Sequence, residues 1–259
     1  MTDQPRIESL FSGIGGLDLA VERVFGARCW AHVEKEPYQR AVLARHWPDA
    51  EQHTDVCAYR GQGAEIVCGG FPCQNISALG DQTGLEGAKS GLWREFARIV
   101  GESKPDCVII ENVKDLRTRG LTEVVADLAC LGYACAWVTV KANAAGVYLQ
   151  RARIILLAVP DGIRRPWSPP TWLQESELRQ VDALDGRYAG LPWPADGARR
   201  GDHNVPQPGI RRGAGGPAAG LDEHRRRARI RSLGNAVVPA QAELALRYLV
   251  PQLLRELGH

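Results

Sequence analysis

The sequence lacks long apolar runs and paired cysteines. No run reaches the roughly 18 apolar residues of a membrane span, and the polar stretch from Met1 to Ile7 does not read as a signal segment. The seven cysteines are an odd number, and none forms a Cys-x-x-Cys pair. This pattern argues against a disulfide framework and is typical of a protein in the reducing cytoplasm. The spacing His53-x3-Cys57 has no second pair, so we expect no metal site.

An overall excess of charge is also missing, because the net charge is only +2 over 259 residues. The distribution is uneven. No lysine follows Lys141, and residues 199–231 hold nine arginines against three acidic residues, a local net charge of +6. Such a segment can follow a phosphate backbone, although a solvated arginine-rich loop is the alternative on composition alone. The length and the 44% apolar content indicate one large domain, or one domain with a small appendage.

What the chain does contain is an alternation of strands and helices. Residues 6–10 read as a strand, residues 11–16 as a glycine-rich turn, and residues 17–22 as the start of a helix. This order opens a nucleotide-binding α/β unit, in which glycines allow close approach of a ligand to the backbone. The three glycines of the turn lie closer together than in the dinucleotide pattern Gly-x-Gly-x-x-Gly.

Two acidic residues lie where later strands of such a sheet would end. Glu34 ends a second strand, residues 27–33, about 20 residues past the turn, where a ribose diol is commonly bound. Asp55 follows a third short strand and would lie at the same edge of the sheet, in reach of an adenine amino group. An ordinary surface position is the alternative for each.

The remaining elements continue the alternation as far as residue 159. We predict helices at residues 37–46, 91–100, 121–131 and 240–257, and strands at residues 64–68, 107–110, 133–140 and 153–159. From Pro160 the chain becomes rich in proline and glycine and loses periodicity. Three tryptophans in this stretch, Trp167, Trp172 and Trp193, indicate that part of it packs.

Cys73 and Glu111 follow two of the predicted buried strands. Cys73 comes next to Pro72, just beyond an apolar strand, which suits a nucleophile, although free cysteines are often simply buried. Glu111 ends the next strand, and the carboxyl ends of parallel strands are where such sheets bind ligands. Arg151 and Arg153, two residues apart, would project from one face of an extended segment.

In this order, the segments resemble the DNA cytosine-5 methyltransferase family of bacterial and phage type. The motifs that carry the resemblance are Phe11-Ser12-Gly13-Ile14-Gly15-Gly16, Gly70-Phe71-Pro72-Cys73-Gln74, Glu111-Asn112-Val113, Arg151-Ala152-Arg153 and Gly234-Asn235-Ala236-Val237-Val238-Pro239. The resemblance implies an α/β, Rossmann-like methyltransferase fold with a mostly parallel sheet. Its catalytic domain would comprise residues 1–159 and 229–259, with a short irregular target-recognition region at residues 160–228.

The resemblance also implies a cofactor and a set of site residues. The cofactor would be S-adenosyl-L-methionine, and the catalytic side chains would be Cys73, Glu111, Arg151 and Arg153. The cofactor-binding residues implied are Phe11, Ser12, Gly13, Gly15, Gly16, Glu34, Asp55, Pro72, Leu92, Asn235 and Val237. The residues implied in DNA binding are Gln74, Ser77, Arg225, Arg226 and Arg227.

The implied activity is methyl transfer to C5 of a cytosine flipped out of double-stranded DNA, through a cysteine adduct at C6. The enzyme would be a cytoplasmic monomer, with a cognate restriction endonuclease as a potential partner. The sequence departs from the family pattern at Leu149, where a glutamine is usual, and in the shortness of the recognition region.

Four alternatives remain open from the residues. They are an RNA (tRNA) cytosine-5 methyltransferase, an enzyme with a modified methyl donor, a catalytically weak or inactive DNA-binding relative, and a nicotinamide-dependent oxidoreductase. The intact Cys73, Glu111 and Arg153 argue against an inactive relative. An oxidoreductase leaves the Pro72-Cys73 and Gly234-Asn235 motifs without a role.

Overall fold

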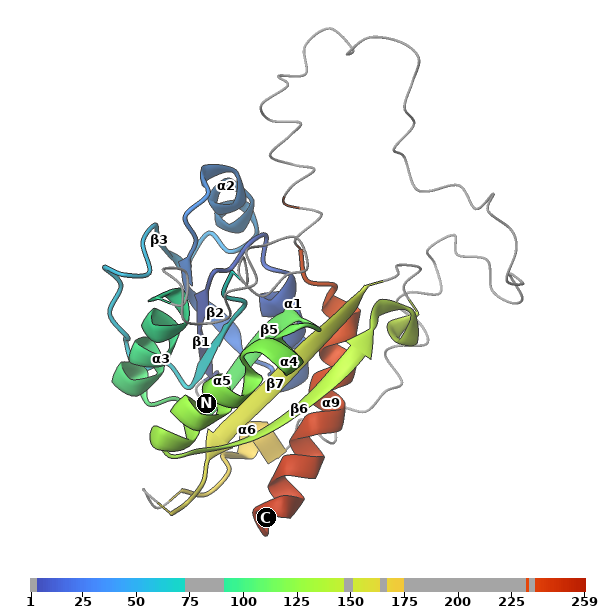
Figure 1. Cartoon of the computed structure of the whole chain (residues 1–259). Helices are drawn as coiled ribbons and strands as arrows, with labels where there is room; N and C mark the ends of the chain where they lie inside the picture. Colours follow the sequence, from blue (N-terminus) through green and yellow to red (C-terminus); the bar gives the residue numbers. More distant parts are fainter. Residues whose placement is uncertain (1–3, 73–90, 147–150, 164–166, 175–231, 233–235) are drawn as a thin grey trace, which may run out of the picture.

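The computed structural model describes residues 4–72, 91–146, 151–163, 167–174, 232 and 236–259. Within these ranges the chain forms a seven-stranded sheet with helices on both faces (Figure 1). The strands are β1 (Arg6–Leu10), β2 (Arg28–Val33), β3 (Glu51–His53), β4 (Ile66–Gly69), β5 (Cys107–Val113), β6 (Tyr133–Lys141) and β7 (Ala152–Pro160). The helical segments are α1 (Gly16–Phe25), α2 (Pro37–His46), α3 (Gly91–Ser103), α4 (Leu116–Arg119), α5 (Leu121–Cys130), η2 (Ala142–Ala145), α6 (Thr171–Gln174) and α9 (Pro239–Glu256).

The sheet has the order β3-β2-β1-β4-β5-β7-β6. The five neighbouring strands β3, β2, β1, β4 and β5 pair in parallel. Strand β7 pairs antiparallel with both β5 and β6. The chain builds outward in one direction from β1 and in the other direction from β4. The carboxyl ends of these two strands therefore flank the point where the strand order reverses, which is where open α/β sheets bind ligands.

Alternating side chains of the central strands supply two cores. In β5, Cys107 and Ile109 face α1 and α9, whereas Val108 and Ile110 face α3, α4 and α5. Strand β7 alternates in the same way. Strands buried on both faces read as continuous apolar runs, which is why these strands could be predicted from the sequence. Figure 1 shows α9, in red, on the α1 side of the sheet, away from α3 and α5 in green.

Part of the proline-rich stretch packs on the first of these cores. The Trp167 indole Nε1 donates to Asp106 Oδ1 at 3.0 Å, Trp172 packs edge-on against Phe25, and Leu173 is fully buried. The prediction that tryptophans in this region pack is therefore confirmed for residues 167–174. Among the described helices, none combines the length and apolar character that a membrane span requires.

The predicted elements are present with shifted ends. The strand that we predicted at residues 107–110 continues to Val113, so Glu111 lies inside β5 rather than beyond it. The segment before β7, expected to be extended, begins with the short helix η2. The polar Asn143 and the small alanines of η2 carry no apolar periodicity that would have indicated a helix.

Candidate active site

A cavity of about 1070 Å³ opens at the carboxyl ends of β1, β4 and β5. It joins the glycine-rich turn after β1, the acidic residues after β2 and β3, and the ends of β4 and β5. Twelve of the residues singled out from the sequence line it: Phe11, Ser12, Gly13, Gly16, Glu34, Asp55, Pro72, Leu92, Glu111, Arg151, Arg153 and Val237.

Backbone strain marks the turn after β1. Phe11 has φ +54° and Gly13 has φ +59°. The left-handed region is costly for a residue with a Cβ, so strain at Phe11 identifies a position that the surrounding structure imposes. At Gly16 a Cβ would lie 2.3 Å from the Val237 carbonyl oxygen. Only glycine therefore lets α1 begin this close to the segment before α9.

Gly15 has a different role from its neighbours in the turn. It is absent from the cavity lining, and its φ is +82° where it caps α1. A Cβ at Gly15 would lie 2.4 Å from the Trp47 ring. Gly15 therefore allows the turn to pack closely against Trp47, at the start of the α2–β3 connection.

Glu34 is a buried carboxylate at the end of the cavity that holds the glycine-rich turn. Its Oε2 accepts from the Gly13 N–H at 2.8 Å, and its Oε1 accepts from the Glu36 N–H at 2.9 Å. Burial raises the pKa of Glu34, against the lowering effect of these two backbone donors. These bonds tie the acidic residue to the glycine-rich turn. Asp55, which is exposed, accepts from the Cys57 N–H at 2.9 Å in a local turn.

Glu111 and Arg153 form an ion pair at the other end of the cavity. In the β5–β7 ladder Glu111 pairs with Ile155 and Val113 pairs with Arg153, so the two charged side chains lie diagonally on one face. Glu111 Oε1 lies 2.8 Å from Arg153 Nε, although the two groups are not aligned as a hydrogen bond. Glu111 Oε2 lies over Gly70, where a Cβ would come within 3.0 Å.

The charge state of this pair is governed by burial. Desolvation raises the pKa of Glu111 above its ordinary value, although Arg153 and Arg151 act to lower it. Burial, and repulsion from Arg153, lower the pKa of the Arg151 guanidinium. Burial therefore acts toward the protonated form of Glu111, and the two arginines act toward the ionised form.

Two amide side chains position the site, and neither was assigned a role from the sequence. Asn112 Nδ2 donates to the Phe71 carbonyl at 3.3 Å, and Asn112 Oδ1 accepts from the Val113 N–H at 2.8 Å. Asn112 thus holds the backbone that leads to Pro72. Gln241, buried on α9, donates to the carbonyls of Val140 and Arg151 at 2.6 and 3.2 Å. The Glu111-Asn112-Val113 motif signalled Asn112, but nothing in the sequence links Gln241 to Arg151.

Pro72 is the last described residue before the predicted nucleophile. Seven predicted site residues lie outside the described ranges: Cys73, Gln74, Ser77, Arg225, Arg226, Arg227 and Asn235. Lining residues that the sequence analysis did not select include Lys35, Arg40 and Thr54, which sit around the Glu34 end.

Comparison with known proteins agrees with this architecture. At 32% identity over 162 residues, the chain matches the type II methyltransferase M2.BsuMI of Bacillus subtilis, covering 59% of this chain and 41% of that protein. It is 38% identical over 112 residues to M.HhaI of Haemophilus parahaemolyticus, covering 42% of this chain and 34% of that protein. The chain thus spans less than half the length of these relatives.

Solved structures share the fold at lower identity. A protein encoded within an E. coli prophage and described as a DNA modification methyltransferase gives a TM-score of 0.53 at 23% identity, covering 64% of this chain and 49% of that one. The S. pombe Dnmt2 methyltransferase gives 0.51 at 16% identity, covering 65% and 52%. These likenesses confirm the methyltransferase fold class predicted from the sequence.

The family comparison covers most of the described structure. The model of the C-5 cytosine-specific DNA methylase family matches residues 5–188, which include the glycine-rich turn, Glu111 and Arg153. With this match, the chain belongs to the C-5 cytosine-specific DNA methylase family.

Proposed function

We propose that this chain transfers a methyl group from S-adenosylmethionine to C5 of cytosine in DNA. The observation that carries the proposal is one cavity that joins Glu34 and the glycine-rich turn to the ion pair of buried Glu111 with partly buried Arg153. A nucleotide-binding end and an acid–base end open into one space. The chain enters that space at Pro72, directly before Cys73.

The cofactor end fits S-adenosylmethionine. Glu34 is a buried acceptor for ribose hydroxyls, and Phe11 offers an aromatic ring at a strained backbone position. Asp55 would accept from the adenine amino group, and Leu92 would contact the adenine ring. Asn235 and Val237 would border the methionine portion. S-adenosylmethionine, when bound, supplies an electrophilic methyl group.

The other end fits cytosine. C5 of cytosine is a poor nucleophile until a thiolate adds to C6, and we assign that addition to Cys73. As the S–C6 bond forms, the electron pair of the C5–C6 double bond moves toward C5, and negative charge develops at N3. A protonated Glu111 would donate to N3, which matches the raised pKa of this residue. Arg153, 2.8 Å from Glu111, would contact O2 of the base and fix the carboxyl group.

The cycle closes without another protein nucleophile. After methylation a base, which we take to be water, removes the C5 proton. The released electron pair restores the C5–C6 double bond as the Cys73 thiolate leaves C6, and N3 returns its proton to Glu111. Because Glu111 is buried within β5, a cytosine would reach it only after flipping out of the duplex.

We infer double-stranded DNA as the substrate. Gln74 and Ser77 would contact it near the flipped base, and Arg225–Arg227 would bind its phosphates within the recognition region at residues 160–228. The chain would act as a monomer, with a restriction endonuclease of the same specificity as its natural counterpart. The basic segment from residue 199 to 231 supports DNA as the substrate.

Bisulfite sequencing of plasmid DNA from cells that express the chain tests the proposal. We expect protected cytosines in one sequence context, and none in DNA from cells that express Cys73→Ala. Purified Cys73→Ala should still bind S-adenosylmethionine in a calorimetric titration, because the thiol is not a cofactor contact. Methylation by the Cys73→Ala variant would contradict the covalent mechanism. Methyl transfer to tRNA but not to duplex DNA would contradict the substrate assignment.

A further inference from the structure

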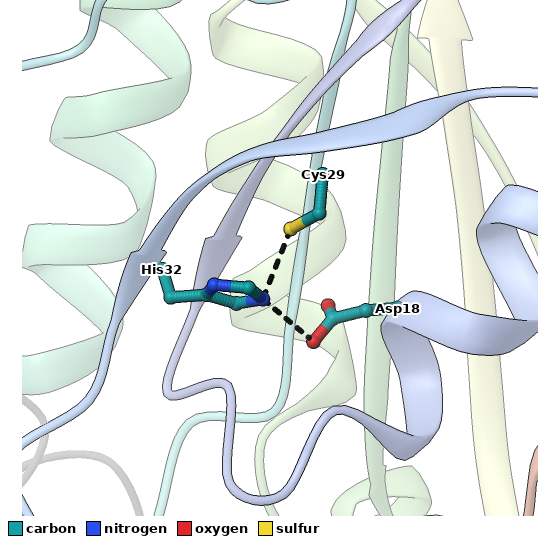
Figure 2. Close-up of side chains that lie close together, drawn as sticks. All are labelled: Asp18, Cys29 and His32. Carbon is teal, nitrogen blue, oxygen red and sulfur yellow. Dashed lines mark hydrogen bonds and ion pairs between the residues drawn. The ribbon is translucent and has the colours of Figure 1, made fainter. Parts of the chain in front are cut away.

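Asp18, Cys29 and His32 form a buried cluster where α1 faces β2 (Figure 2). His32 Nε2 lies 3.1 Å from Cys29 Sγ and 3.6 Å from Asp18 Oδ2. The three potential ligand atoms all lie within 4.8 Å of one another. Exposure is 1% for Asp18, 7% for Cys29 and 0% for His32. Figure 2 shows the three side chains converging from α1 and β2.

An irregularity in the sheet brings Cys29 and His32 to the same face. Residues three apart on a regular strand point to opposite faces. Here the β1–β2 register shifts, because Ile7 pairs with Cys29 and Glu8 pairs with Ala31. The additional residue, Trp30, resets the alternation. A bulge therefore creates this cluster, and Asp18 meets it from the first turns of α1.

One ligand atom of the cluster has no hydrogen bond. Asp18 Oδ2 is buried without a hydrogen-bond partner, whereas Oδ1 accepts from Cys68 Sγ at 3.5 Å. Buried carboxylates are normally paired or bound to a metal, because leaving such a charge unsatisfied in the interior is costly. The free oxygen is the one on the His32 side of the cluster. A cation between these atoms would satisfy it.

The residues around the cluster resemble the outer shell of a metal site. Metal-binding histidines usually bond their other ring nitrogen to an amide, carbonyl or carboxylate, and metal-binding carboxylates are themselves hydrogen-bonded. His32 Nδ1 lies 3.1 Å from the Gln52 side-chain amide, whose Oε1 is buried without a partner. Half a turn of that amide lets Oε1 accept from Nδ1–H. The lone pair of His32 Nε2 then points toward Cys29 and Asp18.

We propose that Asp18 Oδ2, Cys29 Sγ and His32 Nε2 bind a zinc ion. One oxygen, one sulfur and one nitrogen are ligands that zinc accepts in a tetrahedron, whose ligand atoms lie about 3.3–3.6 Å apart. The 3.6 Å between His32 Nε2 and Asp18 Oδ2 falls within this range. The 3.1 Å between Nε2 and Cys29 Sγ is shorter, so binding would move the sulfur outward by a few tenths of an ångström. The charges also balance, because a carboxylate and a thiolate neutralise a dication. Binding releases the Cys29 thiol proton, and a small donor such as water takes the fourth position.

Such an ion would tie α1 to β2 directly below the cofactor end of the cavity. Gly16 begins α1 two residues before Asp18, and Glu34 lies two residues after His32. The ion would hold both residues in register and stabilise the folded chain over the unfolded one. This inference does not rest on methyl transfer, so the metal content can be tested in protein that has no activity.

The test is elemental analysis of the full chain, produced in zinc-supplemented medium and passed over a chelating resin. We expect about one zinc ion per chain. His32→Gln should lose most of it. Cys107→Ala, which removes another fully buried thiol from the same core, should keep it. Cys57→Ser should also keep it; this variant removes one of the two exposed thiols among the described residues, Cys57 and Cys130, where adventitious zinc would bind.

A cobalt-substituted wild-type chain provides a second readout that does not depend on any variant folding. Cobalt bound through Cys29 should show a thiolate-to-metal charge-transfer band in the near ultraviolet, together with visible bands of tetrahedral intensity. The thermal midpoint of unfolding should rise with metal content. Wild-type protein without zinc or a cobalt–thiolate band would overturn the proposal. Equal zinc in folded wild type and His32→Gln would also overturn it.

Discussion

Replacing Glu111 by glutamine removes the proposed proton donor but keeps the size of the side chain at the acid–base end of the cavity. Glutamine keeps the size of the side chain and can still donate an N–H to N3 of cytosine, but it has no proton to transfer. General acid catalysis of this kind contributes about 10²- to 10⁴-fold to a rate. We therefore expect kcat to fall by that factor, equivalent to about 2.7–5.4 kcal/mol of transition-state stabilisation.

The pH dependence makes this prediction more specific. The wild-type rate should fall as the pH rises through the raised pKa of Glu111, because only the protonated carboxyl donates. That limb of the profile should be absent from the residual activity of Glu111→Gln. Methyl transfer from labelled S-adenosylmethionine to duplex DNA, followed across pH, measures both quantities. Glu123→Gln, an exposed substitution on α5, serves as the control and should keep the wild-type profile.

The contribution of Glu111 to the free energy of unfolding should fall as the pH rises. An ion pair that lowers the pKa of a carboxylate has the opposite effect. Burial disfavours ionised Glu111 in the folded chain, and unfolding returns the carboxyl to its ordinary pKa of 4.5. The unfolded state then binds fewer protons, so this group's contribution to stability falls as the pH rises from about 4.5 through the raised pKa. Glu111→Gln should therefore gain in thermal midpoint relative to wild type over that window. Wild-type activity in the variant, or a relative loss of stability as the pH rises, would refute the reasoning.

Three further variants test other parts of the proposal. Gly16→Ala places a Cβ 2.3 Å from the Val237 carbonyl oxygen, and calorimetry should show S-adenosylmethionine binding weakened about tenfold or more. Asn112→Ala removes the bonds to the Phe71 carbonyl and the Val113 N–H, and denaturant unfolding should show a loss of about 1–3 kcal/mol. Reversing the charges of Arg225–Arg227 should weaken DNA binding and reduce the slope of log K against log salt by about 3. An unchanged slope would show that these arginines do not contact phosphate.

The candidate site residues could be selected from the sequence because each belongs to a short motif. Each part of the site can be recognised from a few neighbouring residues. These parts are the glycines at a strand end, the glutamate on an apolar strand and the two arginines two residues apart. Glu111 and Arg153 lie 42 residues apart in the chain, but both belong to strands with clear apolar patterns. Antiparallel pairing of those strands then places them on one face.

What the sequence could not reveal depends on register and distant packing. Gln241 is one polar residue on an otherwise amphipathic helix, and only the docking of α9 brings it to the Arg151 carbonyl. Gly15 reads as a ligand-binding glycine, and only the folded chain shows that a Cβ there would lie 2.4 Å from the Trp47 ring. Both cases arise because helix–sheet packing joins residues that no periodicity connects.

The sequence by itself determined the order of strands and helices, the α/β fold class and the position of the chemical groups along the chain. These follow from apolar periodicity, glycine placement and ordered motifs, which are properties of neighbouring residues. The tertiary structure decided that one cavity joins Glu34 to Glu111, and that burial raises the pKa of Glu111. It also decided that Cys29 and His32 face each other, because one bulge reverses the side-chain alternation that the sequence would predict.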